Sequence, residues 1–323
     1  MILDPNRIGL PSGPFRSRRA WLQRAAGPGL AWALSLAWAG RPLQSDASQT
    51  APANDARPQV EDDRPPRRGQ PGKDVMWLPT PDELLFRLFD VAGITRNDLV
   101  YDLGAGDGRV AIAAARRHGA RAVGIEYDAQ LARHAQRNVE RAGLSERVRI
   151  VQGDIFQMDF SAATVLTLYL LEELNQQLRP TVLAMRPGTR VVSNTFSMGD
   201  WEPDAVIQVE QHTGYFWRVP APVAGRWTLD WPQMGPPATL TLIQRYQRLA
   251  GTIEFGGRSQ PLFGPEIDGA QLSFRFIDES GLLRAVRVQV SGEAFEGIVV
   301  PPYGMVDGAP TAYATRGTRL SGS

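Results

Sequence analysis

Three alternating glycines follow a short apolar run in the stretch Leu99-Val-Tyr-Asp-Leu-Gly-Ala-Gly-Asp-Gly-Arg-Val110. The apolar run predicts a β-strand, and the pattern after the last glycine predicts a helix over Arg109–His118. Gly104, Gly106 and Gly108 suit a tight strand-to-helix turn in which the backbone approaches a ligand closely. The stretch therefore predicts a ligand-binding turn at the edge of a parallel sheet.

Acidic residues close three successive predicted strands. Asp102 lies at the end of the first strand, Glu126 follows it by 24 positions at the end of the second, and Asp154 closes the third. An acid at about the spacing of Glu126 suits hydrogen bonding to ribose hydroxyls. We expect all three acids to meet at one edge of the sheet, forming a nucleoside site. In the alternative interpretation the glycines serve only a tight turn and the acids cap helices.

The charges around the glycines favour one cofactor. The spacing is Gly-x-Gly-x-Gly, with Asp102 two residues before it and Asp107 inside it. Two carboxylates would repel the pyrophosphate of a dinucleotide but attract the ammonium group of a methionine moiety. The turn therefore predicts S-adenosylmethionine rather than NAD.

Six segments match the pattern of a known family: Leu78-Pro-Thr-Pro81, Val100-Tyr-Asp-Leu-Gly-Ala-Gly-Asp-Gly-Arg109, Val123-Gly-Ile-Glu126, Thr164-Val-Leu-Thr-Leu-Tyr-Leu-Leu171, Leu178-Arg-Pro180 and Met198-Gly-Asp-Trp201. On these segments, residues 75–217 resemble a class I S-adenosylmethionine-dependent methyltransferase. More narrowly, they resemble the lysine methyltransferases of the ATP synthase c-subunit and their bacterial relatives. Two departures bear on the acceptor, because the family commonly has a proline where Glu172 stands and a histidine where Asn194 stands.

The resemblance implies a role for each site residue. Asp102 and the backbone of the three glycines would orient the methionine end, Glu126 would hold the ribose, and Asp154 would accept a hydrogen bond from the adenine amino group. Thr80 would close over the methionine carboxylate, although capping a helix alone also explains it.

Two further residues are expected at the methyl acceptor. Tyr169 would address an amine with its ring or hydroxyl group, and Asn175 would contact an acceptor lysine. The alternatives are ordinary packing for Tyr169 and a surface position at a helix start for Asn175.

Alternating strand and helix patterns predict an α/β fold with a doubly wound, Rossmann-like parallel sheet over residues 74–220. Its fourth and fifth strands are predicted at Ala163–Leu171 and Arg190–Phe196. From residue 221 to 323, short alternating runs separated by Gly and Pro predict a small all-β domain, a sandwich or a barrel.

The first 39 residues resemble a targeting signal. Ser17-Arg-Arg-Ala-Trp-Leu-Gln23 resembles a twin-arginine export motif, and the apolar run that follows is short for a membrane span. Residues 40–73 have the composition of a flexible linker. We expect a periplasmic or inner-membrane location, with a cytoplasmic protein that has a basic extension as the alternative.

Composition narrows the chemistry. The 323 residues include no cysteine, three histidines without metal-ligand spacing and one lysine, Lys73, so we expect no metal site and no thiolate or Schiff-base chemistry. Residues 74–323 hold 24 Lys and Arg against 28 Asp and Glu, which argues against a nucleic-acid groove.

The predicted function is protein-lysine N-methylation of a small protein, with a membrane-associated acceptor as one possibility. A small-molecule methyltransferase and a non-catalytic S-adenosylmethionine-binding envelope protein are the alternatives.

Overall fold

The computed structural model describes residues 81–232, 235–300 and 312–320, which all belong to a compact unit spanning Val60–Ser323. Thr80, the predicted leader at 1–39 and the predicted linker at 40–73 lie outside the described residues. Within the described ranges, no helix is long and apolar enough to cross a membrane.

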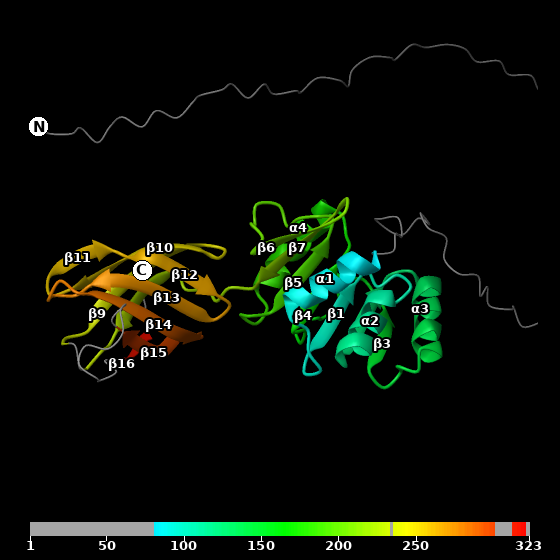
Figure 1. The fold of residues 1–323 in the computed structure, drawn as a ribbon, viewed down its shortest axis with the longest axis horizontal. Helices are drawn as coiled ribbons and strands as arrows, with labels where there is room; N and C mark the ends of the chain where they lie inside the picture. The colour runs from blue at the N-terminus through cyan, green and yellow to red at the C-terminus, as the bar shows by residue number, and fades with distance from the viewer. Residues whose placement is uncertain (1–80, 233–234, 301–311, 321–323) are drawn as a thin grey trace, which may run out of the picture. The chain divides into compact units, whose positions relative to one another are not determined.

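A seven-stranded sheet in the order β3-β2-β1-β4-β5-β7-β6 forms the centre of the first half (Figure 1). Strands β1 to β5 pair in parallel, and β7 and β6 add an antiparallel edge. The order reverses between β1 and β4, so the sheet has a topological switch point at their carboxyl ends. The strands are β1 (Leu99–Leu103), β2 (Arg121–Glu126), β3 (Val148–Gln152), β4 (Val165–Leu168), β5 (Arg190–Asn194), β6 (Ala205–Val209) and β7 (His212–Arg218).

Four helices cover the two faces of this sheet (Figure 1). They are α1 (Asp82–Ala92), α2 (Arg109–His118), α3 (Ala129–Arg141) and α4 (Glu172–Leu183). One apolar core joins α1, α2 and Val139 of α3 to one face of the sheet. A second core, which includes Leu178 and Val182 of α4, lies on the opposite face. The predicted Rossmann-like, mainly parallel sheet is therefore confirmed.

Two strands end earlier in the structure than the sequence predicted. The fourth strand ends at Leu168, three residues before the predicted end, because its parallel pairing with β5 stops at Ser193. The fifth ends at Asn194, which leaves Phe196 in the loop that follows. Both differences fall at the carboxyl edge, so Tyr169 and Phe196 lie outside the strands, beside the expected site.

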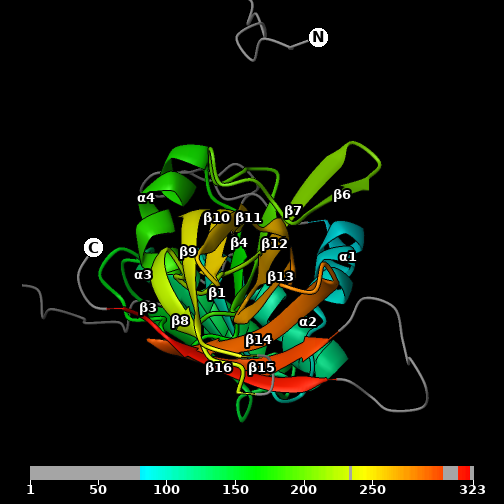
Figure 2. The ribbon, with the colours of Figure 1, turned by 90° about the vertical axis from the view of Figure 1, so that its left-hand side faces the viewer.

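The second half is an antiparallel sheet of nine strands (Figure 2). They are β8 (Gly225–Leu229), β9 (Ala238–Arg245), β10 (Arg248–Phe255), β11 (Arg258–Pro261), β12 (Phe263–Asp268), β13 (Gln271–Ile277), β14 (Leu283–Ser291), β15 (Ala294–Val300) and β16 (Tyr313–Thr318). Bridges from Trp227 to Arg319 and from Asp230 to Arg316 bring the first and last strands together. The sheet therefore closes on itself as a barrel, and β11 pairs only with β10 outside this ring.

Side chains fill the interior of the barrel. Trp227, Phe274 and Phe276 are almost completely buried there, among alternating Leu, Ile and Val side chains. A ring of about eight strands leaves an interior just wide enough for side chains to fill. This half is consistent with the predicted all-β domain, and the predicted boundary at residues 220 and 221 stays a prediction.

Candidate functional site

The three glycines of the turn after β1 all have left-handed backbone conformations. Their φ angles are 83° at Gly104, 57° at Gly106 and 81° at Gly108, values that side chains with a Cβ rarely adopt. The amide groups of Gly104 and Ala105 both donate to the carbonyl of Ile125, at 2.9 Å each, which fixes the turn to β2. The sequence predicted this turn from its glycines, and the backbone angles confirm that glycine is needed.

A fourth glycine, which the sequence analysis did not single out, brings β2 close to the turn. A Cβ on Gly124 would lie 2.7 Å from the Cβ of Ala105 and 2.8 Å from the side chain of Ile150. A glycine inside an otherwise apolar strand can mark such a close approach. The position of Gly124 within β2 was therefore the signal in the sequence.

Asp102 is a buried carboxyl group with one oxygen unused. Its Oδ1 accepts a hydrogen bond of 2.7 Å from the hydroxyl group of Thr167, whereas Oδ2 has no hydrogen-bond partner among the described residues. Burial raises the pKa of Asp102 to about 7, and the nearby Glu126 and Asp107 carboxylates add to the rise. A cationic ligand at Oδ2 would satisfy this oxygen and stabilise its charge.

Glu126 ties the end of β2 to the glycine turn. Its Oε2 accepts from the amide of Gly106 at 2.8 Å, and its Oε1 accepts from the amide of Asp128 at 3.0 Å. Burial raises the pKa of Glu126, although these amide donors oppose the rise. Each oxygen keeps a second lone pair, so the carboxylate can still accept a hydrogen bond from a ligand hydroxyl group.

Asp154 follows β3 and starts a turn. Its Oδ1 accepts from the amide of Phe156 at 3.0 Å, which is the capping role that the alternative interpretation expected. Two aromatic side chains at these strand ends were not predicted: Tyr127, which is 49% exposed, and Phe156, which is 41% exposed. They follow Glu126 and Asp154 in the chain, so they flank the part of the sheet edge where the adenine base of the cofactor is expected.

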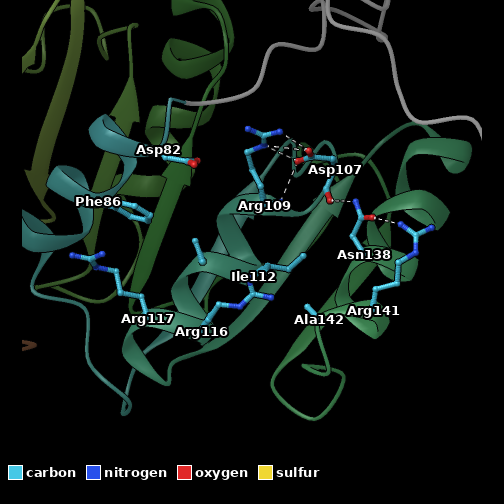
Figure 3. Close-up of a pocket in the computed structure, with 11 residues that line it drawn as sticks. Asp82, Phe86, Asp107, Arg109, Ile112, Arg116, Arg117, Asn138, Arg141 and Ala142 are labelled. Carbon is cyan, nitrogen blue, oxygen red and sulfur yellow. Dashed lines mark hydrogen bonds and ion pairs between the residues drawn. The ribbon is translucent and has the colours of Figure 1, made fainter.

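Asp107 has a cationic partner that the sequence did not predict. The guanidinium group of Arg109 donates to both of its oxygens, at distances of 2.9–3.1 Å (Figure 3). Because of this pair, the negative charge of Asp107 is largely offset and is less available to a methionine ammonium group than its sequence position predicted. Among the described residues, Asp102 is thus the acid near the turn that has no cationic side chain beside it.

A pocket of about 590 Å³ lies along the outer face of α2 (Figure 3). Its lining includes Asp107 and Arg109 but none of the predicted cofactor or acceptor residues. Arg117 lies over the ring of Phe86, with 4.4 Å between the guanidinium carbon and the ring centroid. The pocket therefore lies along α2 and meets the glycine turn at Asp107.

Tyr169 lies directly after β4, at the switch point. Parallel register places Leu168 beside Leu103, so Tyr169 is adjacent to the glycine turn. A Cβ on Gly104 would lie 3.1 Å from Leu170, which confirms how closely the two loops approach. The ring centroid of Phe196, beyond β5, is 6.4 Å from that of Tyr169. Tyr169 and Phe196 are both partly exposed.

Asn175 is fully buried in α4 rather than at its surface. Its Nδ2 donates to the carbonyl groups of Phe196 and Ser197, at 3.2 and 3.1 Å. In this structure Asn175 therefore holds the loop after β5, and a role at an acceptor lysine would act through that loop.

The arrangement fits S-adenosylmethionine. Asp102 and Glu126 meet at the glycine turn as predicted, Asp154 lies at the end of the neighbouring strand, and Thr80 is outside the described residues. The unpartnered Oδ2 of Asp102 suits an ammonium group, and the left-handed glycines leave room for close approach of a ligand to the backbone. Among the described residues, no group of three or more potential metal ligands is present.

Comparison with known proteins agrees with this geometry. A model of the ANTKMT methyltransferase domain matches residues 102–205. A protein-lysine N-methyltransferase of Saccharolobus islandicus (strain REY15A) is 41% identical over 149 residues, which are 44% of this chain and 92% of that protein. The lysine N-methyltransferase of the ATP synthase c-subunit from Xenopus laevis is 28% identical over 114 residues, 35% of this chain and half of that protein.

A solved structure is also similar. It is an RNA methyltransferase from Salinibacter ruber in complex with S-adenosyl-L-homocysteine, with 47% identity and a TM-score of 0.44, covering 45% of this chain and 96% of that one. Because the match to the Saccharolobus islandicus protein covers nearly all of that relative, the family of this chain is established. The chain belongs to the protein-lysine N-methyltransferase family of S-adenosylmethionine-dependent methyltransferases.

Proposed function

We propose that the carboxyl edge of β1, β2 and β3 holds S-adenosylmethionine and that a protein lysine reaches it beside Tyr169. The observation that carries the proposal is the unpartnered, buried Oδ2 of Asp102 at the switch point. Asp102 would pair with the methionine ammonium group, and Glu126 would accept from the ribose hydroxyl groups. Asp154, at the end of the neighbouring strand, would accept from the adenine amino group.

The glycine turn would complete the cofactor site. Gly104, Gly106 and Gly108 bring backbone amide groups to the ligand without a Cβ in the way. The predicted contact from Thr80 would add to these, at a position one residue before the described range.

When bound, S-adenosylmethionine would supply a sulfonium methyl group, which the neutral amine of a lysine would accept while S-adenosylhomocysteine leaves and the amine loses a proton. The chain's part is to orient the two reactants and exclude water. Tyr169 would contact the acceptor amine with its ring face or its hydroxyl group. A lysine reacts only as the neutral amine, and removal of water around it lowers its pKa and favours that form.

Asn175 would act as a positioning residue. Its amide group holds the carbonyl groups of Phe196 and Ser197, and it is too deeply buried to reach an acceptor. Loss of Asn175 would therefore displace the loop rather than remove a contact with lysine.

The relatives and the N-terminal sequence support a proposal for the acceptor class and the location. The relatives named above act on a protein lysine and on the ATP synthase c-subunit, which supports a small, membrane-associated protein as the acceptor here. The twin-arginine-like segment at residues 17–23 supports a periplasmic or inner-membrane location. A cytoplasmic enzyme is the alternative, since the cofactor is made in the cytoplasm.

Incubation of the full chain with methyl-labelled S-adenosylmethionine and a membrane extract tests the proposal. We expect label on lysine of a small polypeptide, identified by mass spectrometry, and none with Asp102→Asn. Label in RNA or in a metabolite would contradict the lysine acceptor. Binding of the cofactor without transfer to any fraction would favour a non-catalytic role. Cell fractionation with sequencing of the mature N-terminus tests the location.

A further inference from the structure

The chain leaves β5 through a strained turn. Thr195 has a φ angle of 68°, which is unusual for a β-branched residue. The amide of Phe196 donates to the carbonyl of Asn194 at 2.8 Å, so Thr195 is the central residue of a γ-turn with positive φ, a rare and strained type. Strain of this kind persists only where the surroundings hold it, and it concentrates at functional sites.

Hydrogen bonds from buried side chains and from a neighbouring strand hold this turn. The hydroxyl group of Ser193 donates to the carbonyl of Phe196 at 2.7 Å, and Asn175 donates to the same carbonyl at 3.2 Å. The amide of Thr195 donates to the carbonyl of Thr213 on β7 at 2.7 Å. Ser193 and Asn175 are both fully buried, so the loop is anchored from inside the sheet.

The turn directs Phe196 toward Tyr169. Their ring centroids are 6.4 Å apart with 33° between the ring planes, which is a direct contact between the rings. At this separation no alkyl chain fits between them, so the two rings form one continuous surface. We call this surface, made of Tyr169 and Phe196, the aromatic wall.

We propose that Phe196 is a specificity-determining residue that completes the acceptor site, and that the strained turn at Thr195 positions it. This inference rests on the proposed function, because it takes Tyr169 to lie at the acceptor. The wall offers an apolar and aromatic surface to the alkyl stem and amine of a lysine side chain. A smaller acceptor without a long alkyl stem would gain little from Phe196.

Binding of a short synthetic peptide with one central lysine, measured by calorimetry on the full chain saturated with S-adenosylhomocysteine, tests the wall. Phe196→Leu should weaken peptide binding by about tenfold, because it removes the aromatic face. Phe196→Tyr should bind within about threefold of the natural chain, and the affinity for S-adenosylhomocysteine should stay within about twofold in both. Phe263→Leu is the matched control, since it removes a 40% exposed phenylalanine from β12 in the barrel.

Thr195→Gly tests the positioning. Glycine adopts positive φ without strain, so the melting temperature should be unchanged or higher. The peptide should nevertheless bind several-fold more weakly, because the loop is less restrained. A Thr195→Gly chain that binds the peptide as tightly as the natural chain would overturn the positioning role of the turn.

The outcomes separate this inference from the proposed function. If the natural chain does not bind the peptide, or if Phe196→Leu binds it equally well, the aromatic wall is wrong, whether or not methyl transfer occurs. If binding depends on Phe196 but no methyl group reaches the lysine, the proposed function fails and the wall stands.

Discussion

Asp98 and Asp102 lie at opposite ends of β1 and have opposite electrostatic environments. Asp98, just before the strand, accepts from the amide of Thr95 at 2.7 Å and from the hydroxyl of Thr164 at 2.8 Å, and it pairs with Arg190. Burial alone would raise the pKa of Asp98, but these donors lower it below its ordinary value. Asp102, near the carboxyl end, keeps an unpartnered oxygen and a pKa raised to about 7. One strand thus has a structural acid at one end and, at the other, the acid that we propose binds the ligand.

Asp98→Ala should destabilise the fold without changing the site. Loss of this carboxylate leaves Arg190 with only the carbonyl groups of Ala92 and Gly93 as partners. Loss of hydrogen bonds to a partly buried charged group costs about 1–3 kcal/mol of unfolding free energy. Because the pKa of Asp98 is lowered, the stability it provides is present above its unfolded pKa and is lost as pH falls through its folded pKa.

Denaturation with urea measures the loss in Asp98→Ala, and Asp90→Ala, an exposed acid on α1, serves as the control, with an expected change within about 0.5 kcal/mol. An affinity for S-adenosylhomocysteine that fell more than about twofold in the folded Asp98→Ala chain would argue against the separation of the two roles.

Asp102→Asn should have the reverse effect of Asp98→Ala: it should stabilise the ligand-free fold and weaken cofactor binding. Burial of the charged Asp102 carboxylate destabilises the folded chain. The rise of its pKa from 3.8 to about 7 corresponds to a free-energy cost of about 4 kcal/mol. The amide of asparagine would itself lack a partner, which reduces the expected gain in the ligand-free chain to about 1–3 kcal/mol. Cofactor affinity should fall by about a hundredfold or more, because the ammonium group loses its counter-charge. Thermal unfolding with and without S-adenosylmethionine measures both effects, and an Asp102→Asn chain that the ligand stabilises as strongly as the natural chain would contradict the assignment.

Cofactor affinity should depend on pH through Asp102. Binding of an ammonium group requires the carboxylate, and the pKa of Asp102 in the free chain is about 7. The dissociation constant should therefore rise as pH falls below about 7, approaching tenfold per pH unit near pH 5.5. Calorimetry between pH 5.5 and 7.5 measures this slope. Burial also raises the pKa of Glu126, so Glu126→Gln is the control, and the slope should persist in it. A flat profile in the natural chain would show that the ligand does not pair with Asp102.

The glycine turn and its helix were predictable because their signals are local. The alternating glycines and the pattern from Arg109 to His118 predicted α2 with the bounds it has. Tyr169–Leu171 is as apolar as the strand before it, so only the pairing with β5 reveals that β4 has already ended. The strained turn at Thr195 was likewise hidden, because threonine normally favours extended backbone.

In the barrel, too, local sequence patterns could not predict how distant strands pair. Short alternating runs predicted several strands but not their closure, which depends on Trp227 and Arg319 meeting from opposite ends of the domain. The strand Tyr313–Thr318, which closes the ring, was missed because Arg316 and Gly317 interrupt its apolar pattern. Pairing between strands that are distant in the sequence leaves little trace in local periodicity.

Gly124→Ala tests the packing beneath the cofactor site. The added methyl group would lie 2.7 Å from the Cβ of Ala105 and 2.8 Å from Ile150, so the glycine turn or β3 must shift. Overpacking of this kind costs about 1–3 kcal/mol, and displacement of the turn should weaken S-adenosylmethionine binding by at least about tenfold.

Gly143→Ala is the matched control, because glycine is replaced there at a φ of 67° with no atom within 4 Å of the new Cβ. It should cost about 1 kcal/mol of stability and leave cofactor affinity unchanged. Urea denaturation and calorimetry on both variants separate the two quantities. If Gly124→Ala loses stability but binds the cofactor as the natural chain does, the close approach of β2 to the turn serves the fold alone. A loss of affinity in Gly124→Ala and not in Gly143→Ala would mean that the position of the turn, rather than overall stability, sets cofactor binding.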